Sequence, residues 1–336
     1  MSDRNDIAVL QDGHKRRINY LRLSITDRCN LRCQYCMPAE GEQFLPRAEL
    51  LSDAELLTLG RVAAGIGIRK IRITGGEPLL HPNVVELLRS LRALPGLERL
   101  VLTTNGLRLA ELAAPLREAG IEGVNISIDS LRPDRYAEIT RGGDLARCRA
   151  GIDAALEAGF FTKINMVVMR GVNDDEVLDF VDLAREHPLS VRFIEYMPTR
   201  GDNGDNLTVP AEELLERIGQ SHELQAQTHK SSGVMAGPAR NYRLAGAVGT
   251  VGVISPVSKM FCSSCNRIRV GADGMARGCL FLNEPVDLRP QLRAGDEAGL
   301  AKTLQELVLR KPEQHDLTPD GRRDDDDPLA MSRMGG

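Results

Sequence analysis

Three cysteines in the first part of the chain constrain its fold and chemistry more than any other feature. Cys29, Cys33 and Cys36 are spaced C-x3-C-x2-C and follow an alternating apolar run over residues 21–25. Three thiolates are few for a zinc site, which normally takes four protein ligands or three plus water, but they suit an iron–sulfur cluster with one open iron. The apolar run predicts a strand, so we expect the cysteines on a loop at its carboxyl end, where α/β folds carry their chemistry.

The C-x-x-C pair Cys33 and Cys36 alone is a weak signal, because redox disulfides and zinc knuckles use the same spacing. Cys29 at its added spacing favours a cluster over both alternatives. Together with Tyr35 before the last cysteine, the loop resembles the radical S-adenosylmethionine (SAM) superfamily, whose C-x3-C-x2-C loop binds a 4Fe-4S cluster. The resemblance implies that the open iron holds the amino and carboxylate groups of SAM.

Length and charge exclude several classes of protein. The chain has 336 residues, enough for one large α/β domain or for one with a smaller companion. Its net charge of -4 and pI near 6.0 give no overall attraction to nucleic acid or to an anionic membrane, so neither is expected as a partner. Residues 1–17 are polar, and no run of about 18 apolar residues occurs, so we expect a cytoplasmic protein.

The seven cysteines are not expected to form disulfides, because the predicted compartment is reducing and the count is odd. Six of them fall in two triplets. Cys148 stands alone in a helical pattern and is predicted to be an ordinary buried thiol.

Strand and helix patterns alternate along the chain up to about residue 219. Strands are predicted near residues 70–74, 98–103, 123–128, 161–168 and 190–197, and helices near 83–93, 109–118, 147–158, 174–186 and 210–219. Ser52 and Glu55 form a capping-box pattern at the start of the first helix. Counting the strand before the cysteines, six β/α units in succession predict a parallel sheet, either open or curled into a partial barrel.

The predicted strands alternate apolar and polar residues, whereas strands buried on both faces usually read as continuous apolar runs. The alternation places Arg22, Arg72, Lys163 and Arg192 on the face opposite the helices. A buried cation without a partner is costly, so these four on one face indicate a wet cavity that receives a polyanion, such as a phosphate-bearing ligand. The alternative is that they pair with Asp129 and other carboxylates.

Glycines and polar residues follow several of the predicted strands. Gly75 and Gly76 precede Glu77 after the second strand, and paired glycines let a backbone approach a ligand closely. In the superfamily that the cysteine loop resembles, this Gly-Gly-Glu-Pro motif receives the SAM amino group. The same resemblance implies that SAM contacts Tyr35, Gly76, Ser127 and Met197, and that the substrate contacts Arg72, Thr103 and Lys163.

A second cysteine triplet lies in the last third of the chain, after glycine-rich polar loops. Cys262, Cys265 and Cys279 are spaced C-x2-C-x13-C, and no histidine inside the span offers a fourth zinc ligand. A second cluster with an open iron is therefore favoured over zinc. Arg267 and Arg269 occupy alternate positions, so both can point the same way, and guanidinium groups suit phosphate oxygens. The alternative is that both arginines lie exposed on a solvated strand.

Both triplets, the Arg-x-Arg sequence and the terminal Gly-Gly together resemble the MoaA family, the GTP 3',8-cyclases of molybdenum-cofactor biosynthesis, over nearly the whole chain. The resemblance implies an α/β fold with an incomplete (β/α)6 radical SAM barrel over residues 1–228. It also implies a C-terminal region, residues 229–336, that carries the second cluster and the Gly-Gly tail. Two 4Fe-4S clusters and SAM would be the cofactors, and GTP the substrate.

By the same resemblance, the first cluster passes an electron to SAM, and the resulting 5'-deoxyadenosyl radical takes the 3' hydrogen of the GTP ribose. Attack of the carbon radical on C8 of guanine yields (8S)-3',8-cyclo-7,8-dihydroguanosine 5'-triphosphate in the first step of molybdopterin biosynthesis. A MoaC-type cyclic pyranopterin monophosphate synthase would be the pathway partner that consumes this product. The sequence leaves the oligomeric state open, with a homodimer as one option.

The family's functional residues carry over to positions of this chain. The resemblance assigns Cys29, Cys33 and Cys36 to the first cluster, and Cys262, Cys265 and Cys279 to the second, whose open iron binds guanine. It assigns GTP contacts to Arg22, Arg72, Thr103, Lys163, Arg267, Ile268 and Arg269, and catalytic roles to Arg267, Arg269, Gly335 and Gly336. Composition predicts a disordered acidic tail, in which Arg333 and Met334 depart from the aromatic and aliphatic residues usual in the family.

Two other functions fit parts of the sequence. A radical SAM enzyme with an auxiliary cluster could act on a peptide, but it would not need the barrel cations or the Gly-Gly terminus. An iron–sulfur or zinc carrier protein without enzyme activity would need no SAM pocket and no turn at Gly76.

Overall fold

The computed structural model describes residues 9–197, 207–227, 237–281 and 284–315. The strands of the first part are β1 (Tyr20–Ser24), β2 (Lys70–Thr74), β3 (Arg99–Thr104), β4 (Gly123–Ser127), β5 (Phe161–Val168) and β6 (Ser190–Glu195). The helices that follow them are α1 (Asp53–Gly65), α2 (Val84–Arg92), α3 (Leu109–Glu118), α4 (Pro133–Thr140), α5 (Leu145–Glu157), α6 (Val177–Glu186) and α7 (Ala211–Gly219). The predicted alternation of strands and helices is confirmed, although the prediction missed α4.

Strands β1 to β6 are parallel neighbours in chain order, so the predicted α/β class with a parallel sheet is confirmed. The capping box at the start of α1 is also confirmed. Ser52 Oγ accepts a hydrogen bond from the Glu55 N–H at 3.3 Å, and the Glu55 carboxylate accepts one from the Ser52 N–H at 2.7 Å. This reciprocal pair satisfies two N–H groups that a helix start otherwise leaves without partners.

The second part of the chain extends both edges of the same sheet. Its elements are β7 (Leu224–Ala226), β8 (Arg240–Leu244), β9 (Thr250–Ile254), β10 (Arg267–Val270), β11 (Met275–Arg277), β12 (Val286–Asp287), α8 (Arg289–Ala294) and α9 (Glu297–Leu309). Strand β10 pairs in parallel with β1, which places Arg269 opposite Arg22, and β9 pairs in parallel with β6. The described strands therefore run in the order β12-β11-β10-β1-β2-β3-β4-β5-β6-β9-β8-β7.

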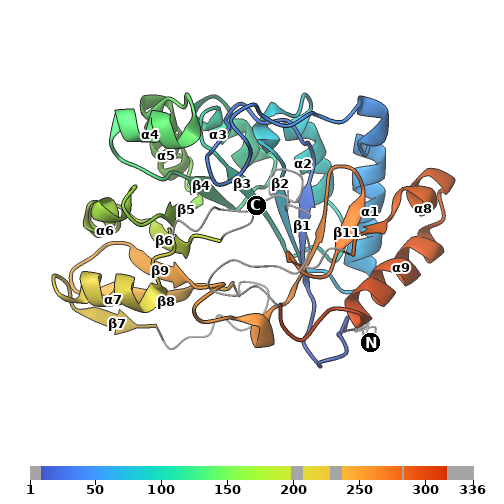
Figure 1. Ribbon diagram of the computed structural model, residues 1–336. Helices are drawn as coiled ribbons and strands as arrows, with labels where there is room; N and C mark the ends of the chain where they lie inside the picture. Colours follow the sequence, from blue (N-terminus) through green and yellow to red (C-terminus); the bar gives the residue numbers. More distant parts are fainter. Residues whose placement is uncertain (1–8, 198–206, 228–236, 282–283, 316–336) are drawn as a thin grey trace, which may run out of the picture.

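The helices lie outside the strands. Figure 1 shows α4 to α7 on one side of the molecule and α1, α8 and α9 on the opposite side, with the strands between them. Apolar strand residues such as Leu21, Ile71 and Ile164 are fully buried and belong to the main hydrophobic core. Burial of these alternate residues leaves the intervening polar residues on the other face of the sheet.

Three further predictions bear on this fold. Cys148 is a buried free thiol in α5, as predicted. None of the helices in the described ranges is both long and apolar enough to cross a membrane. The predicted division between residues 228 and 229 falls outside the described residues and stays a prediction.

Candidate active site between two cysteine triplets

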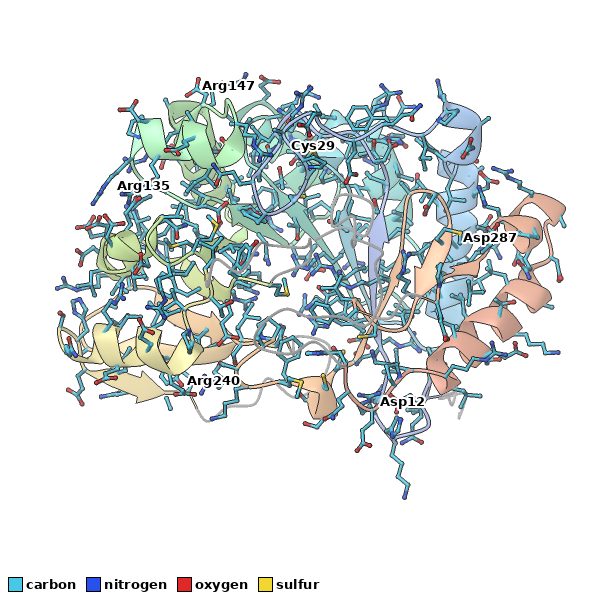
Figure 2. All side chains as sticks on the ribbon, in the orientation of Figure 1. Asp12, Cys29, Arg135, Arg147, Arg240 and Asp287 are labelled. Atoms are coloured by element: carbon cyan, nitrogen blue, oxygen red, sulfur yellow. The ribbon has the colours of Figure 1, made fainter. Side chains whose placement is uncertain are left out.

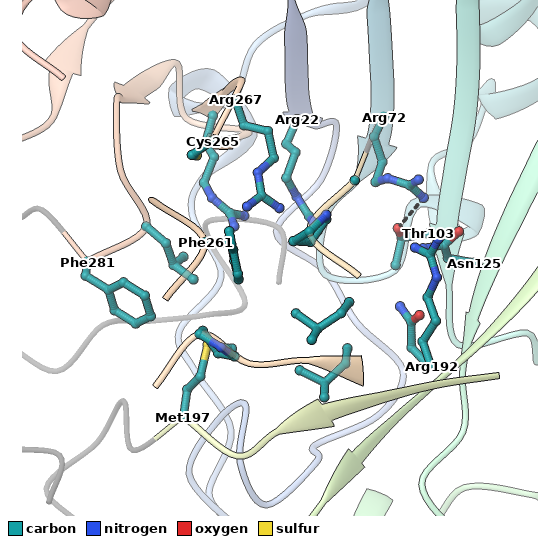
Figure 3. Close-up of a pocket in the computed structure, with 18 of the residues that line it drawn as sticks. Arg22, Arg72, Thr103, Asn125, Arg192, Met197, Phe261, Cys265, Arg267 and Phe281 are labelled. Atoms are coloured by element: carbon teal, nitrogen blue, oxygen red, sulfur yellow. Dashed lines mark hydrogen bonds between the residues drawn. The ribbon is translucent and has the colours of Figure 1, made fainter. Parts of the chain in front are cut away.

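A cavity of about 240 Å³ lies on the polar face of the sheet. Side chains from β1 to β6, β9 and β10 line it, at positions that alternate with the buried apolar residues of the same strands. Figure 3 shows labelled arginines from β1, β2, β6 and β10 around this space. The cationic residues of the lining are Arg22, Lys70, Arg72, Lys163, Arg192, Arg267, Arg269 and Lys311. The four cations predicted to share one face therefore do so.

Asp129 lines the same cavity but does not neutralise these cations. Its Oδ2 accepts a hydrogen bond from the Tyr35 hydroxyl at 2.8 Å, and its Oδ1 accepts one from the Val167 N–H at 2.8 Å. Burial raises the pKa of Asp129 to about 6, although these two hydrogen bonds oppose the rise. Within the described part of the chain, Nε of Arg192 is buried without a hydrogen-bond partner. Asp129 therefore does not pair with these cations, contrary to the alternative considered from the sequence.

The concentration of positive charge disfavours protonation of the lysines. Burial, followed by the charges of Arg192, Arg72 and Lys70, lowers the pKa of Lys163 to about 6. Burial also lowers the pKa of Lys70 to about 8. Bringing a polyanion into the cavity would relieve this repulsion and favour the protonated lysines. The cavity is therefore built for a ligand with several negative charges.

Arg72 is held in place from three sides. Its Nε donates to the Tyr20 hydroxyl at 2.5 Å, and its Nη1 donates to the Leu102 carbonyl oxygen and to Thr103 Oγ1, both at 3.2 Å. Figure 3 shows the hydrogen bond between Arg72 and Thr103. Burial would raise the pKa of Tyr20, but the charges of Arg72, Arg22 and Lys70 lower it to about 7. The guanidinium thus has a fixed orientation before any ligand binds, which favours tight anion binding.

The first triplet lies on the loop after β1, at the carboxyl end of the strand, as predicted. Cys29 Sγ accepts a hydrogen bond from the Leu31 N–H at 3.4 Å, and the Cys36 N–H donates to the Cys33 carbonyl oxygen at 2.9 Å. Burial raises the pKa of the Cys33 thiol, and the charges of Asp129, Cys36 and Cys29 add to the rise. The Cys33 thiol thus lies close enough to Cys29 and Cys36 to interact electrostatically with both. A cationic group bound to the three cysteines would stabilise their thiolates.

The Gly-Gly-Glu-Pro turn packs directly against this loop. A Cβ built on Gly76 would lie 2.3 Å from the Arg28 carbonyl oxygen, so no larger residue fits there without a shift of backbone. Glu77 Oε1 accepts hydrogen bonds from the Leu79 N–H at 2.9 Å and the Thr104 hydroxyl at 2.7 Å. Its Oε2 accepts one from the Asn105 N–H at 2.7 Å. The buried carboxylate therefore ties the ends of β2 and β3 beside the first triplet.

The second triplet lines the cavity with all three of its thiols. Cys262 begins a 3-10 turn (Cys262–Ser264) before β10, and Cys279 follows β11. Burial would raise the pKa of Cys265, but the charges of Arg267 and Lys311 lower it to about 6. Arg16 donates hydrogen bonds to both Asp12 and the Cys262 carbonyl oxygen, so Asp12 marks the end of the molecule that carries the second triplet. Figure 2 shows Asp12 and Cys29, a residue of the first triplet, at opposite ends of the molecule. The two triplets thus lie at opposite ends of the site.

Both triplets have the donor set of an iron–sulfur cluster. None of the six cysteines is in a disulfide, and thiolates are the usual cluster ligands. In the described part of the chain, no three His, Cys, Asp or Glu side chains are grouped in a way that could hold a single metal ion. Three thiolates with one open iron are the ligand set of an iron–sulfur cluster, whereas a zinc site normally takes four ligands.

Several of the predicted ligand contacts lie together in the cavity, and others do not. Tyr35, Ser127, Met197 and Thr103 are among its lining residues. The Ile268 side chain is fully buried on the other face of β10, because it alternates with two cavity-lining arginines, so only its backbone could meet a ligand. Gly335 and Gly336 lie outside the described residues.

Sequence reasoning missed other residues of the lining. Tyr20 and Lys70 lie two positions before Arg22 and Arg72 on their strands, so the same alternation could have identified them. Lys311 and His315 also line the cavity, but they follow α9, and no local pattern links them to a site.

Comparisons with known proteins agree with this geometry. The Radical SAM superfamily model matches residues 23–184, and the Molybdenum Cofactor Synthesis C model matches residues 189–317. The crystal structure of Streptococcus suis SuiB bound to precursor peptide SuiA aligns with 93% of this chain and 76% of that chain, at a TM-score of 0.59 and 16% identity. SuiB bound to S-adenosylmethionine aligns with 91% of this chain and 76% of that chain, at a TM-score of 0.57 and 14% identity. The fold and the site thus define a member of the radical SAM superfamily.

Relatives with higher identity narrow this class. The GTP 3',8-cyclase of Geobacter sulfurreducens is 52% identical over 329 residues, which are 97% of this chain and 99% of the relative. The GTP 3',8-cyclase of Moorella thermoacetica is 50% identical over 331 residues, 97% of this chain and 100% of the relative. The chain belongs to the GTP 3',8-cyclase family.

Proposed function

We propose that this chain converts GTP to (8S)-3',8-cyclo-7,8-dihydroguanosine 5'-triphosphate, the first step of molybdenum cofactor biosynthesis. Membership of the GTP 3',8-cyclase family and the match to the Molybdenum Cofactor Synthesis C model support this reaction. The structural observation that carries the proposal is a single cavity lined by cations and by cysteines of both triplets. Such a cavity can hold a nucleoside triphosphate beside a SAM-binding loop.

The first triplet would hold a 4Fe-4S cluster and, through its open iron, SAM. When bound, the cluster and SAM together supply the radical that starts the reaction. The chain's own residues orient SAM. Tyr35, Ser127 and Met197 would contact it from the cavity wall, where their side chains lie, and the backbone at Gly76 would receive its amino group. Hydrogen bonding to Asp129 fixes the Tyr35 ring beside Cys36.

The cations would bind the triphosphate of GTP. The proposed contacts are Arg22, Arg72, Thr103, Lys163, Arg267, the backbone of Ile268, and Arg269. Each charge-assisted hydrogen bond of this kind contributes about 1.5 to 3 kcal/mol. A bound triphosphate would also raise the low pKa of Lys163 and so recruit a proton to its Nζ. The role of Arg267 and Arg269 in catalysis would be to hold the nucleotide in the orientation that cyclisation requires.

We also propose that Cys262, Cys265 and Cys279 would hold a second 4Fe-4S cluster, which would bind the guanine. Support comes from the exposure of all three thiols to the cavity and from the nearby charges that favour the Cys265 thiolate. Gly335 and Gly336, outside the described residues, would position or gate the radical step.

The finer architecture belongs to the same proposal. An incomplete (β/α)6 barrel over residues 1–228, closed by residues 229–336, is supported by the contribution of β1 to β6, β9 and β10 to a single cavity. The product would pass to a MoaC-type cyclic pyranopterin monophosphate synthase. Seven cysteines outside disulfides are typical of a reducing compartment and support a cytoplasmic location. A homodimer stays one option for the assembly.

Anaerobic reconstitution followed by incubation with SAM, dithionite and GTP tests the reaction. We expect 5'-deoxyadenosine and a cyclised nucleotide in equal amounts, detected by liquid chromatography with mass spectrometry. The Cys29→Ala variant, which lacks a ligand of the first cluster, is the matched control and should give neither product. Cleavage of SAM by the parent protein without any cyclised nucleotide would overturn the proposed substrate.

A further inference from the structure

Residues 311–315, which directly follow α9, contact the surroundings of the second triplet; we call this segment the strap. The Lys311 ammonium donates a hydrogen bond to the carbonyl oxygen of Gly278, the residue before Cys279. The backbone N–H of His315 lies near the Cys262 thiol. The strap therefore contacts both of the chain segments that carry the cysteines.

The His315 side chain extends these contacts. Its Nε2 lies 3.0 Å from the Pro256 carbonyl oxygen, and its ring centroid lies 4.6 Å from that of Phe281. His315 is 9% exposed and Phe281 is 5% exposed. The imidazole thus packs between the segment before the first two cysteines and the segment after the third.

A buried arginine from the other end of the sequence fastens the strap. Arg16 Nη1 donates to the Cys262 carbonyl oxygen at 2.8 Å and to the Glu313 carbonyl oxygen at 2.7 Å, and its Nη2 donates to the Pro312 carbonyl oxygen at 2.5 Å. Its Nε donates to Asp12 Oδ2 at 2.5 Å. Only a guanidinium offers donors at this spacing and in several directions, so lysine cannot replace Arg16 here.

Lys311 adds a charge to this arrangement. It is only 4% exposed, and its side-chain hydrogen bond within the described residues goes to a carbonyl oxygen. A buried ammonium is costly unless negative charge lies nearby. Lys311 lines the same cavity as Cys262, Cys265 and Cys279. The ammonium therefore lies beside the second triplet, where the negatively charged ligands of a bound group would offset its burial.

A purely structural role would join the two ends of the sequence and nothing more. The contacts go further, because Arg16 bonds the Cys262 carbonyl oxygen, and the Lys311 ammonium bonds the residue before Cys279 in the cavity that all three cysteines line. Hydrogen bonds to sulfur and nearby charge are the features that set the reduction potentials of iron–sulfur clusters. Residues around the ligands also control how firmly a metal is held.

We propose that Arg16 and Lys311 are positioning residues of the second triplet. Arg16 clamps the strap onto the Cys262 turn and so controls how firmly the group bound there is retained. Lys311 places a cation beside the sulfurs and so raises the reduction potential of that group. The inference rests on the proposed second cluster.

Measurements on that cluster alone test the inference. In the full chain carrying Cys29→Ala, Cys33→Ala and Cys36→Ala, only the second triplet can hold a cluster. In this background, Arg16→Lys should speed the loss of iron to a chelator by about tenfold. This is the lower end of the effects on metal affinity that follow from mutating residues around metal ligands. The exposed neighbour Arg17 provides the matched control, and Arg17→Lys should leave the rate unchanged.

The charge is tested separately by potentiometry with electron paramagnetic resonance. Lys311→Met should shift the midpoint potential to a more negative value, because reduction adds an electron that the ammonium stabilises. Lys311→Arg, which keeps the charge, should keep the midpoint potential close to that of the background protein. Lys302→Met, on the exposed surface of α9 at 78% side-chain exposure, should cause none.

The outcomes separate the two proposals. If the background protein binds no iron–sulfur cluster at the second triplet, the proposed second cluster is wrong and the inference falls with it. If the cluster forms, but Arg16→Lys retains iron as the background does and Lys311→Met keeps its potential, the inference alone is wrong. A uniform loss of thermal stability without either change would identify the strap as a structural lock only.

Discussion

Arg192 offers the sharpest test of the cation-lined cavity, because its removal should have opposite effects on stability and on binding. The residue lies on β6 and lines the cavity, and its Nε has no hydrogen-bond partner in the described part of the chain. Arg192→Gln keeps a polar side chain, shorter than that of arginine, but removes the positive charge. We expect the ligand-free protein to become more stable and nucleotide binding to become weaker.

The protein should become more stable because the buried positive charge of Arg192 destabilises the ligand-free state. Burial, followed by the nearby Arg72 guanidinium, lowers the pKa of Arg192 well below its ordinary value, to about 10. Because a difference of one in pKa corresponds to about 1.4 kcal/mol, the charged form costs the ligand-free protein at most roughly 3 to 4 kcal/mol. Water in the cavity screens part of this cost, so we expect the free energy of unfolding to rise by about 1 to 2 kcal/mol.

The loss in binding follows from the positive charge that Arg192 adds to the cavity beside the proposed triphosphate contacts. A charge-assisted hydrogen bond to phosphate contributes about 1.5 to 3 kcal/mol, which corresponds to a loss of about 10- to 150-fold in affinity. Guanosine carries no phosphate, so its affinity should hardly change. The ratio of the two affinities isolates the phosphate contribution from any general change in the cavity.

Calorimetric titration of the reconstituted protein with GTP and with guanosine measures binding, and urea unfolding without ligand measures stability. Arg185→Gln is the matched control, because this arginine lies on neighbouring α6 with 50% side-chain exposure and pairs with Asp182 at the surface. It should change neither quantity. A less stable Arg192→Gln protein, or an unchanged ratio of GTP to guanosine affinity, would refute the reasoning.

Four further predictions follow from the same structure. GTP affinity should fall as the pH rises above about 6, because the free protein then carries a neutral Lys163 that must take up a proton when GTP binds. Lys163→Met should make the affinity less dependent on pH in titrations between about pH 6 and 8. Cys262→Ala should lower the iron content from about eight to about four per chain, as measured by a colorimetric assay. Deletion of Gly335 and Gly336 should leave GTP binding nearly intact but stop cyclisation, measured as product. Ser52→Ala should lower the free energy of unfolding by about 1 kcal/mol in urea, through loss of the cap of α1.

Each of these predictions has a clear contrary result. An identical pH dependence in the parent and Lys163→Met proteins would show that another group takes up the proton. Full iron content in Cys262→Ala would remove that cysteine from the second cluster. Cyclisation at the parent rate after the deletion would make the two glycines dispensable, and unchanged stability of Ser52→Ala would show that water replaces the cap.

The parts of the site that could be predicted from the sequence are those with a local cause. Side chains alternate between the two faces of a strand, so Arg22, Arg72, Lys163 and Arg192 could be assigned to one face before their strands were placed. The spacing of each cysteine triplet is likewise a property of a short loop. Parallel order followed from the alternation of strands and helices, because a helix crossover returns the chain to the same end of the sheet.

Tertiary structure alone decided how the second part of the chain joins the first. Pairing of β10 with β1 and of β9 with β6 brings both edges of the sheet to the cavity, and no sequence period encodes such pairing. Arg16 bonds residues 246 to 297 positions away, and Lys311 reaches the second triplet only because α9 ends beside it. The alternation of side chains along a strand specifies which face of the sheet a residue occupies. It does not specify which other segment packs against that face, so contacts between segments this distant in sequence are decided only by the tertiary structure.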